Sequence, residues 1–98
     1  MARFDVHEVD NGTLVVVCQS ELLDHLEVRF VAPLIPIESA PAAAGRLNPT
    51  IDVQGRQFLL FPQWSSGMAS KHLGQKQANI EAQGLTIINA FDMLISGI

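Results

Sequence analysis

The side chains best suited to chemistry in this sequence are one cysteine and three histidines: Cys18, His7, His25 and His72. Cysteine beside histidine is the pattern of a nucleophile with its base, and Asp24 stands directly before His25, where a carboxylate would orient the imidazole. Cys18, however, ends an apolar run, and a thiol in such a run usually behaves as a small buried hydrophobic group. The histidines are 18 and 47 residues apart, which matches no metal-binding spacing. We therefore expect no catalytic residues, no metal and no cofactor.

Other short patterns carry little chemistry. Residues 74–77, Gly-Gln-Lys-Gln, lack the glycine spacing and the Lys-Ser/Thr pair of a phosphate-binding loop. The acidic residues near positions 8–10 and 24–27 show no sign of burial, so we interpret them as a solvated rim. Trp64, the sole tryptophan, stands in a polar stretch. It either anchors a partner or covers the end of the core, and we favour the second interpretation.

Composition limits the class of protein. The chain has 98 residues, of which 48% are hydrophobic and 16% charged, and this predicts one compact domain over residues 1–98 rather than disorder. The net charge is −4 and the six basic residues are scattered, which argues against direct binding of nucleic acid by phosphate neutralisation. A chain this apolar with so few charges also favours a homodimer.

Targeting signals are not evident in the sequence. One cysteine leaves no intramolecular disulfide, so a disulfide-stapled secreted fold is not expected. The first residues show no apolar segment of a signal peptide. The longest apolar runs are far shorter than the roughly 20 residues of a membrane-spanning helix. We expect a cytoplasmic protein without membrane contact.

Strand patterns fill the first two thirds of the chain. Residues 4–9 predict a strand, and Asn11-Gly12 predicts a type I′ turn into a second strand over 13–18, which is apolar on both faces and therefore central. A third strand is predicted over 27–35, with Pro33 and Pro36 marking its end or an edge.

The next part of the chain is less regular. Residues 37–48 are interpreted as a connecting loop, with room for one short helical turn. A second hairpin is predicted over residues 49–61 around Gln54-Gly55, followed by a polar loop over 62–67. Residues 68–83 are ambiguous, with a weak strand around 77–82.

An amphipathic helix is predicted over residues 85–96. Its apolar positions share one face at helical spacing: Ile87, Ile88, Phe91, Leu94 and Ile95. Asn89, Asp92 and Ser96 fall on the opposite, solvent-facing stripe. Thr86 or Gly84 is expected to cap the start of the helix, and Gly97 stands where a left-handed residue ends one.

Several segments, taken in order, resemble the CcdB family of toxins from bacterial toxin–antitoxin systems. They include an aliphatic strand that runs into Gln-Ser-Glu-Leu-Leu-Asp and the Gly-Ile pair that follows the final helix. The matching segments are residues 4–6, 14–24, 31–34, 47–49, the Gly55 hairpin, 68–70, 73–74 and 87–98. The resemblance implies a mostly β fold with a C-terminal α-helix: an SH3-like, CcdB-type antiparallel β-barrel-like sheet plus a small extra β segment.

The resemblance also implies a function without chemistry. Family members are homodimers that bind the dimerisation region of the DNA gyrase A subunit and trap gyrase while its DNA is cut. A cognate antitoxin neutralises them through a flexible C-terminal tail. By this resemblance the chain is a toxin of a type II system, an inhibitor that acts by binding and not an enzyme.

The family's gyrase contacts map onto named positions here. They come from Trp-Gly-Ile at the chain end, an asparagine one helical turn earlier, and two isoleucines after the second strand. Gly97 and Ile98 match, and Leu22 and Leu23 supply the aliphatic pair. Asp92 stands for the asparagine, and Ser96 replaces the tryptophan, which is the kind of side chain that dominates interface energies.

The predicted helix places two of these positions together. Asp92 and Ser96 are four residues apart on the exposed stripe, and they form one surface with the end of the chain. The last turn has an acid but no Lys or Arg, which opposes the helix dipole and favours a basic partner. A merely solvated helix end accounts for each of these residues equally well.

Two other functions stay open. One is a diverged protein that keeps only antitoxin binding and a co-repressor role, which the Ser96 substitution makes reasonable. The other is an mRNA-cleaving toxin with the same barrel, in which Arg29 or Arg56 would lie in a groove. Scattered basic residues and an acidic composition argue against the second.

Overall fold

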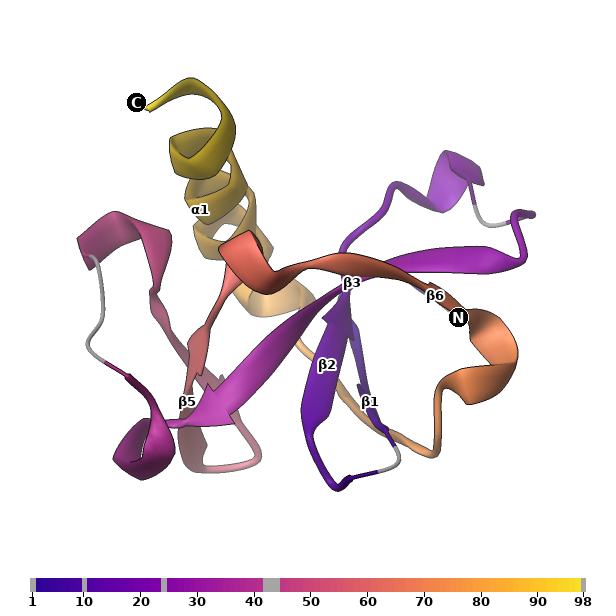
Figure 1. Cartoon of the computed structure of the whole chain (residues 1–98), viewed down its shortest axis with the longest axis horizontal. Coiled ribbons are helices and arrows are strands. Elements are labelled where there is room, and N and C mark those ends of the chain that lie inside the picture. The colour runs from indigo at the N-terminus through magenta and orange to yellow at the C-terminus, as the bar shows by residue number, and fades with distance from the viewer. Residues whose placement is uncertain (1, 10, 24, 42–44, 98) are drawn as a thin grey trace.

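A computed structural model describes residues 2–9, 11–23, 25–41 and 45–97 of the chain. Within these residues, a seven-stranded antiparallel sheet curls into a half-barrel and is followed by one α-helix (Figure 1). The expected fold class is therefore confirmed. The elements are β1 (Asp5–Glu8), β2 (Leu14–Val17), β3 (Val28–Pro36), β4 (Thr50–Val53), β5 (Arg56–Leu60), β6 (Ser66–Ala69), β7 (Lys76–Asn79) and α1 (Gly84–Ser96).

The sheet has the order β4-β5-β3-β2-β1-β7, and β6 pairs with β3 outside this path. β2 is central, as its sequence predicts, and its side chains feed two cores. Val16 lies in the main core inside the half-barrel, with Val6, Leu34 and Ile87. Val15 and Val17 point to the other face, where a smaller cluster includes Leu73. A strand buried on both faces therefore reads as a continuous apolar run.

β3 corrects the prediction that Pro33 marks a strand end or an edge. The strand continues for nine residues and pairs along one edge with β2 and along the other with β6 and then β5. The carbonyl of Pro33 accepts a hydrogen bond from the Phe61 N–H at 3.1 Å. Pro33 thus faces the junction between β6 and β5, where a missing N–H breaks no ladder bond.

Both predicted hairpins form, and the second turns at Gln54-Gly55 as expected, but the turn of the first differs from the predicted type. Asn11-Gly12 does not form a type I′ turn: Gly12 has φ +83°, whereas Asn11 stays at negative φ and its Oδ1 accepts from the Thr13 N–H at 3.0 Å. The left-handed pair is instead Gln54 and Gly55, with φ +53° and +85°. Glutamine tolerates this region less well than Asn or Gly. We therefore expect the Gln54 side chain to make a stabilising contact that offsets the backbone strain.

The ambiguous middle of the chain is more ordered than its sequence indicates. Residues 37–48 contain two short 3-10 turns, Ile37–Ser39 and Gly45–Leu47, with residues 42–44 outside the described part. β6 was not predicted, because Ser-Gly-Met-Ala lacks the branched or aromatic side chains typical of strands. β7 begins at Lys76 and ends at Asn79, earlier than the predicted strand.

The beginning of α1 is tied to the half-barrel. A 3-10 turn, Glu81–Gln83, leads directly into the helix. The Gln83 side chain donates to the Asp52 carbonyl at 2.7 Å and accepts from the Asp52 N–H at 2.9 Å. Gly84 lies against the Phe4 ring, so a Cβ there would come within 2.7 Å of it. Packing against Phe4 and the two hydrogen bonds between Gln83 and Asp52 (the Gln83 clamp) thus fix the start of α1. The predicted caps Gly84 and Thr86 are wrong: the N-cap residue is Gln83, and its side chain makes no cap hydrogen bond.

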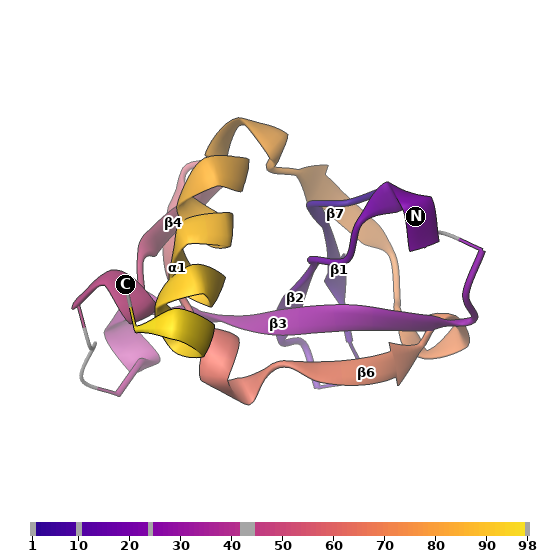
Figure 2. The same ribbon diagram turned by 90° about the horizontal axis from the view of Figure 1, so that it is seen from above.

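The outer part of α1 departs from the predicted apolar face. Ile87 is buried, but Ile88 and Leu94 are about two-fifths exposed and Ile95 is 81% exposed. The last turns of the helix rise beyond the sheet (Figure 1), and seen from above α1 lies beside β4 while β3 and β6 extend away from it (Figure 2). Helical spacing alone does not show where the supporting layer ends.

Helix length is also informative about membranes. Within the described ranges, no helix is both long and apolar enough to span a bilayer.

Candidate functional site

The candidate nucleophile is not activated. The Cys18 thiol donates to the Val16 carbonyl at 3.4 Å and packs against the main core. Burial raises the pKa of this thiol to about 12, which disfavours the reactive thiolate. Asp24, the carboxylate that would orient His25, lies outside the described residues. The structural interpretation of Cys18 fits this environment.

The histidines are distributed rather than clustered. His7 is buried on β1, and its Nδ1 donates to the Gly74 carbonyl at 2.9 Å. His25 and His72 are exposed. In the part of the chain that the structure describes, no group of three His, Cys, Asp or Glu side chains is arranged to hold a metal ion.

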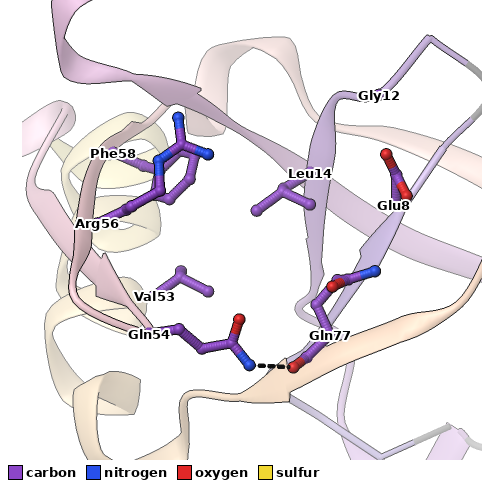
Figure 3. A pocket seen from close by; sticks show the side chains of 8 residues that line it. All are labelled: Glu8, Gly12, Leu14, Val53, Gln54, Arg56, Phe58 and Gln77. Atoms are coloured by element: carbon purple, nitrogen blue, oxygen red, sulfur yellow. Dashed lines mark hydrogen bonds between the residues drawn. The ribbon is translucent and has the colours of Figure 1, made fainter.

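A pocket of about 250 Å³ opens at the mouth of the half-barrel, between β1–β2 and β4–β5. Arg56 and Glu8 project from its two walls, and the Gln54 side chain donates to the Gln77 carbonyl at 2.8 Å across its lower rim (Figure 3). This bond explains why glutamine is tolerated in the left-handed turn: it links the tip of one hairpin to the edge strand β7.

The two arginines of the mRNA-cleavage hypothesis do not share this pocket. Arg56 lies over the Phe58 ring at 5.1 Å and is 3.8 Å from Glu38. Arg29 is buried on β3, where its guanidinium donates to the Leu26 carbonyl. Arg56, which is near the Glu38 carboxylate, does not by itself form a basic surface that could bind a phosphate backbone.

The end of α1 presents a preformed exposed tip. Asp92 and Ser96 are both exposed, and the Ser96 hydroxyl donates to the Asp92 carbonyl at 2.7 Å. Gly97 adopts the expected left-handed conformation, φ +75°, and its N–H donates to the Met93 carbonyl at 3.0 Å. The last turn contains no basic residue. Ile98 lies outside the described residues.

Leu22 and Leu23 lie in a different place from this tip. They belong to the 3-10 turn η1 (Glu21–Leu23), where Leu22 is 86% exposed and Leu23 45% exposed. Gln19 braces the turn: its Nε2 donates to the Leu23 carbonyl at 3.3 Å and its Oε1 accepts from the Phe30 N–H at 2.8 Å. Turn and helix end project from the same side of the sheet but at opposite ends of the molecule (Figures 1 and 2). Within one chain, the structure therefore does not bring Leu22 and Leu23 together with the tip of α1, the other part of the predicted gyrase contact.

An apolar surface between these two ends was missed in the sequence. Phe30 on β3 contacts Phe91 on α1, with ring centroids 5.7 Å apart. Val28, Phe30 and Ile88 remain exposed beside this contact. The sequence does contain a pattern that indicates this surface: Val28 and Phe30 alternate in phase with the buried Ala32 and Leu34, so all four lie on one face of the strand. Val28 and Phe30 stay exposed because the start of β3 extends past α1.

The half-barrel thus supports two exposed features, the tip of α1 and the apolar face of Val28, Phe30 and Ile88. Residues 3–97 match the family model described as CcdB protein. The chain therefore belongs to the CcdB family, whose members are toxins of toxin–antitoxin systems. A comparison with curated proteins gives no match.

Proposed function

We propose that this chain is the toxin of a type II toxin–antitoxin system and that it binds the DNA gyrase A subunit and traps the DNA-cleaved complex. The observation that carries the proposal is the tip of α1, which a member of the CcdB family presents to solvent with its exposed side chains already ordered. Asp92, Ser96, Gly97 and Ile98 form the proposed contact at the tip, and Leu22 and Leu23 form its second part. The toxin acts by binding and performs no chemical step.

A homodimer fits the separation of these two parts. The exposed apolar surface of Val28, Phe30 and Ile88 would be covered by a second copy, since apolar patches of this kind mark interfaces. A two-fold arrangement would present two helix tips to a partner that is itself two-fold symmetric. The cognate antitoxin would neutralise the dimer through a flexible tail, in the cytoplasm where gyrase works.

Ser96 supports a second candidate function. Its hydroxyl is turned back to the Asp92 carbonyl, so this position adds no large side chain to the tip. A chain that binds its antitoxin and acts as a co-repressor, without acting on gyrase, is consistent with that geometry.

Purified gyrase with supercoiled plasmid tests the proposal. Linear DNA should accumulate when the protein is added to gyrase and should not form when either component is omitted. An RNA substrate without gyrase is the matched control for the mRNA-cleaving alternative. Full supercoiling activity with no linear DNA would contradict the toxin function and favour the co-repressor; RNA cleavage without gyrase would contradict both.

A further inference from the structure

Trp64 is a large aromatic side chain that stacks on the core at the surface of the fold. It ends the 3-10 turn η4 (Pro62–Trp64) and is 53% exposed, while the neighbouring Phe61 is buried. The two rings are stacked, with centroids 4.4 Å apart and planes at 12°. Because Phe61 covers one face of the indole, the exposed area belongs to the opposite face and the edges.

The turn that presents Trp64 is braced on several sides. The Trp64 N–H donates to the Phe61 carbonyl at 3.0 Å, and Pro62 at the start of the turn is buried. Asn48, itself buried, donates through Nδ2 to the Leu60 carbonyl and to Gln63 Oε1, each at 3.0 Å. An immobilised aromatic group loses little conformational entropy when a partner covers it.

The position of the turn links Trp64 to the proposed contact surface. η4 packs against both β3 and α1. The sequences of η4, β6 and α1 contain no Lys or Arg, and Asp92 is the only charged residue among them. η3 (Gly45–Leu47), which also packs against α1, carries Arg46, so both signs of charge lie near this helix. η4 itself is uncharged and adjoins the helix that carries the tip, so it offers a partner an apolar surface beside the proposed contact.

We infer that Trp64 is an anchor residue of the surface that binds the gyrase A subunit. The inference rests on the proposed function, and it extends the contact from the tip of α1 to the turn beside it. Tryptophan held in place and half exposed is the side chain most typical of interface hot spots. Trp64 then has both roles considered from the sequence. One face of its indole covers Phe61 at the end of the core, and the other face is available to the partner.

The test uses the full chain and a fragment of the gyrase A dimerisation region. Trp64→Ala should weaken binding about 30-fold, as expected for a hot spot. Trp64→Phe keeps a ring on Phe61 and should recover most of the affinity. Leu85→Ala, at a residue 73% exposed near the start of α1, is the matched control and should change affinity less than about twofold. Thermal unfolding of each variant checks that the fold persists.

A second readout follows from Trp64 being the sole tryptophan. Chain labelled with 5-fluorotryptophan gives one ¹⁹F resonance, which should shift when the gyrase fragment binds. In the unlabelled chain, the Trp64 fluorescence should become protected from quenching by iodide. If the wild type binds but Trp64→Ala binds equally well, the inference is overturned and the proposed function stands. If Trp64→Ala turns a dimer into a monomer, Trp64 belongs to the dimer interface and the inference is also overturned. If the wild type does not bind, the proposed function fails first.

Discussion

In the first half of α1, Ile87 and Ala90 are fully buried, whereas in the last turn Ile95 is 81% exposed and Leu94 42% exposed. Both halves have the same apolar character in sequence. The first half is held by Phe4 and by the hydrogen bonds of Gln83 to Asp52, whereas beyond the contact of Phe91 with Phe30 the last turns rise past the sheet (Figure 1). One helix thus places similar side chains in two environments: the buried half stabilises the fold, and the projecting half carries the proposed gyrase contact.

The largest expected effect is a difference in protein stability between substitutions in the buried half and in the projecting half of α1. Ile87→Ala should lower the free energy of unfolding by about 2–5 kcal/mol, because it removes a fully buried side chain from the main core. Ile95→Ala is the matched substitution in the projecting half and should change it by less than about 0.5 kcal/mol. Urea unfolding measures both. Similar losses in the two variants would contradict the division of the helix.

A smaller effect is expected where the helix begins. Gly84→Ala adds a methyl group that meets Phe4 Cε2 at 2.7 Å. Alanine favours helix by about 1 kcal/mol over glycine, but overpacking costs about 1–3 kcal/mol, so we expect a net loss of up to about 2 kcal/mol. Thr86→Ala, at an exposed position of the same turn, is the control. A gain in stability on Gly84→Ala would show that Phe4 does not fix this end.

The smallest effect concerns the sheet edge that leads to the helix, and it depends on pH. Asp5 is buried, and burial raises its pKa, but hydrogen bonds from Asn79 and the Ala2 N–H and the charge of Lys76 together lower it below the ordinary 3.8. Because the pKa of Asp5 is lower in the folded state than in the unfolded state, its ionised carboxylate stabilises the fold at any pH above the unfolded-state pKa. This contribution is lost as the pH falls through the folded-state pKa.

Asp5→Asn should therefore cost about 1 kcal/mol at pH 7, and the difference from the wild type should shrink below about pH 4. Chemical unfolding of both proteins at pH 7 and at a series of acidic values measures this. Glu8→Gln, at an exposed position of the same strand, provides the comparison. A difference that stays constant down to pH 2 would show that the ionised carboxylate is not the stabilising form.

Local chemistry made part of the fold predictable. The run before Cys18 predicted a strand buried on both faces, and Gly97 predicted the left-handed end of α1. Both features depend on residues that are neighbours in sequence. Pro33 was misread because its tolerance depends on a junction between β5 and β6 that only the assembled sheet creates.

The candidate surface was less predictable for the same reason. The exposure of Asp92 and Ser96 followed from helical spacing, but that of Ile95 depended on where the sheet stops. The turn that presents Trp64 is held through Gln63 by Asn48, which is distant in sequence and shows no pattern of its own. Leu22 and Leu23 lie far from the tip of α1 within one chain (Figures 1 and 2), so they would act with it only through the proposed dimer, an arrangement that no local pattern in the sequence indicates.

The most direct test of the central claim removes only the projecting tip. A chain that lacks residues 96–98 keeps every buried residue of α1, so its unfolding temperature should stay within about 4 °C of the full chain. In the gyrase assay on supercoiled plasmid, the full chain should produce linear DNA and the shortened chain should produce none. Equal amounts of linear DNA from both chains would contradict the assignment of the α1 tip as the gyrase contact.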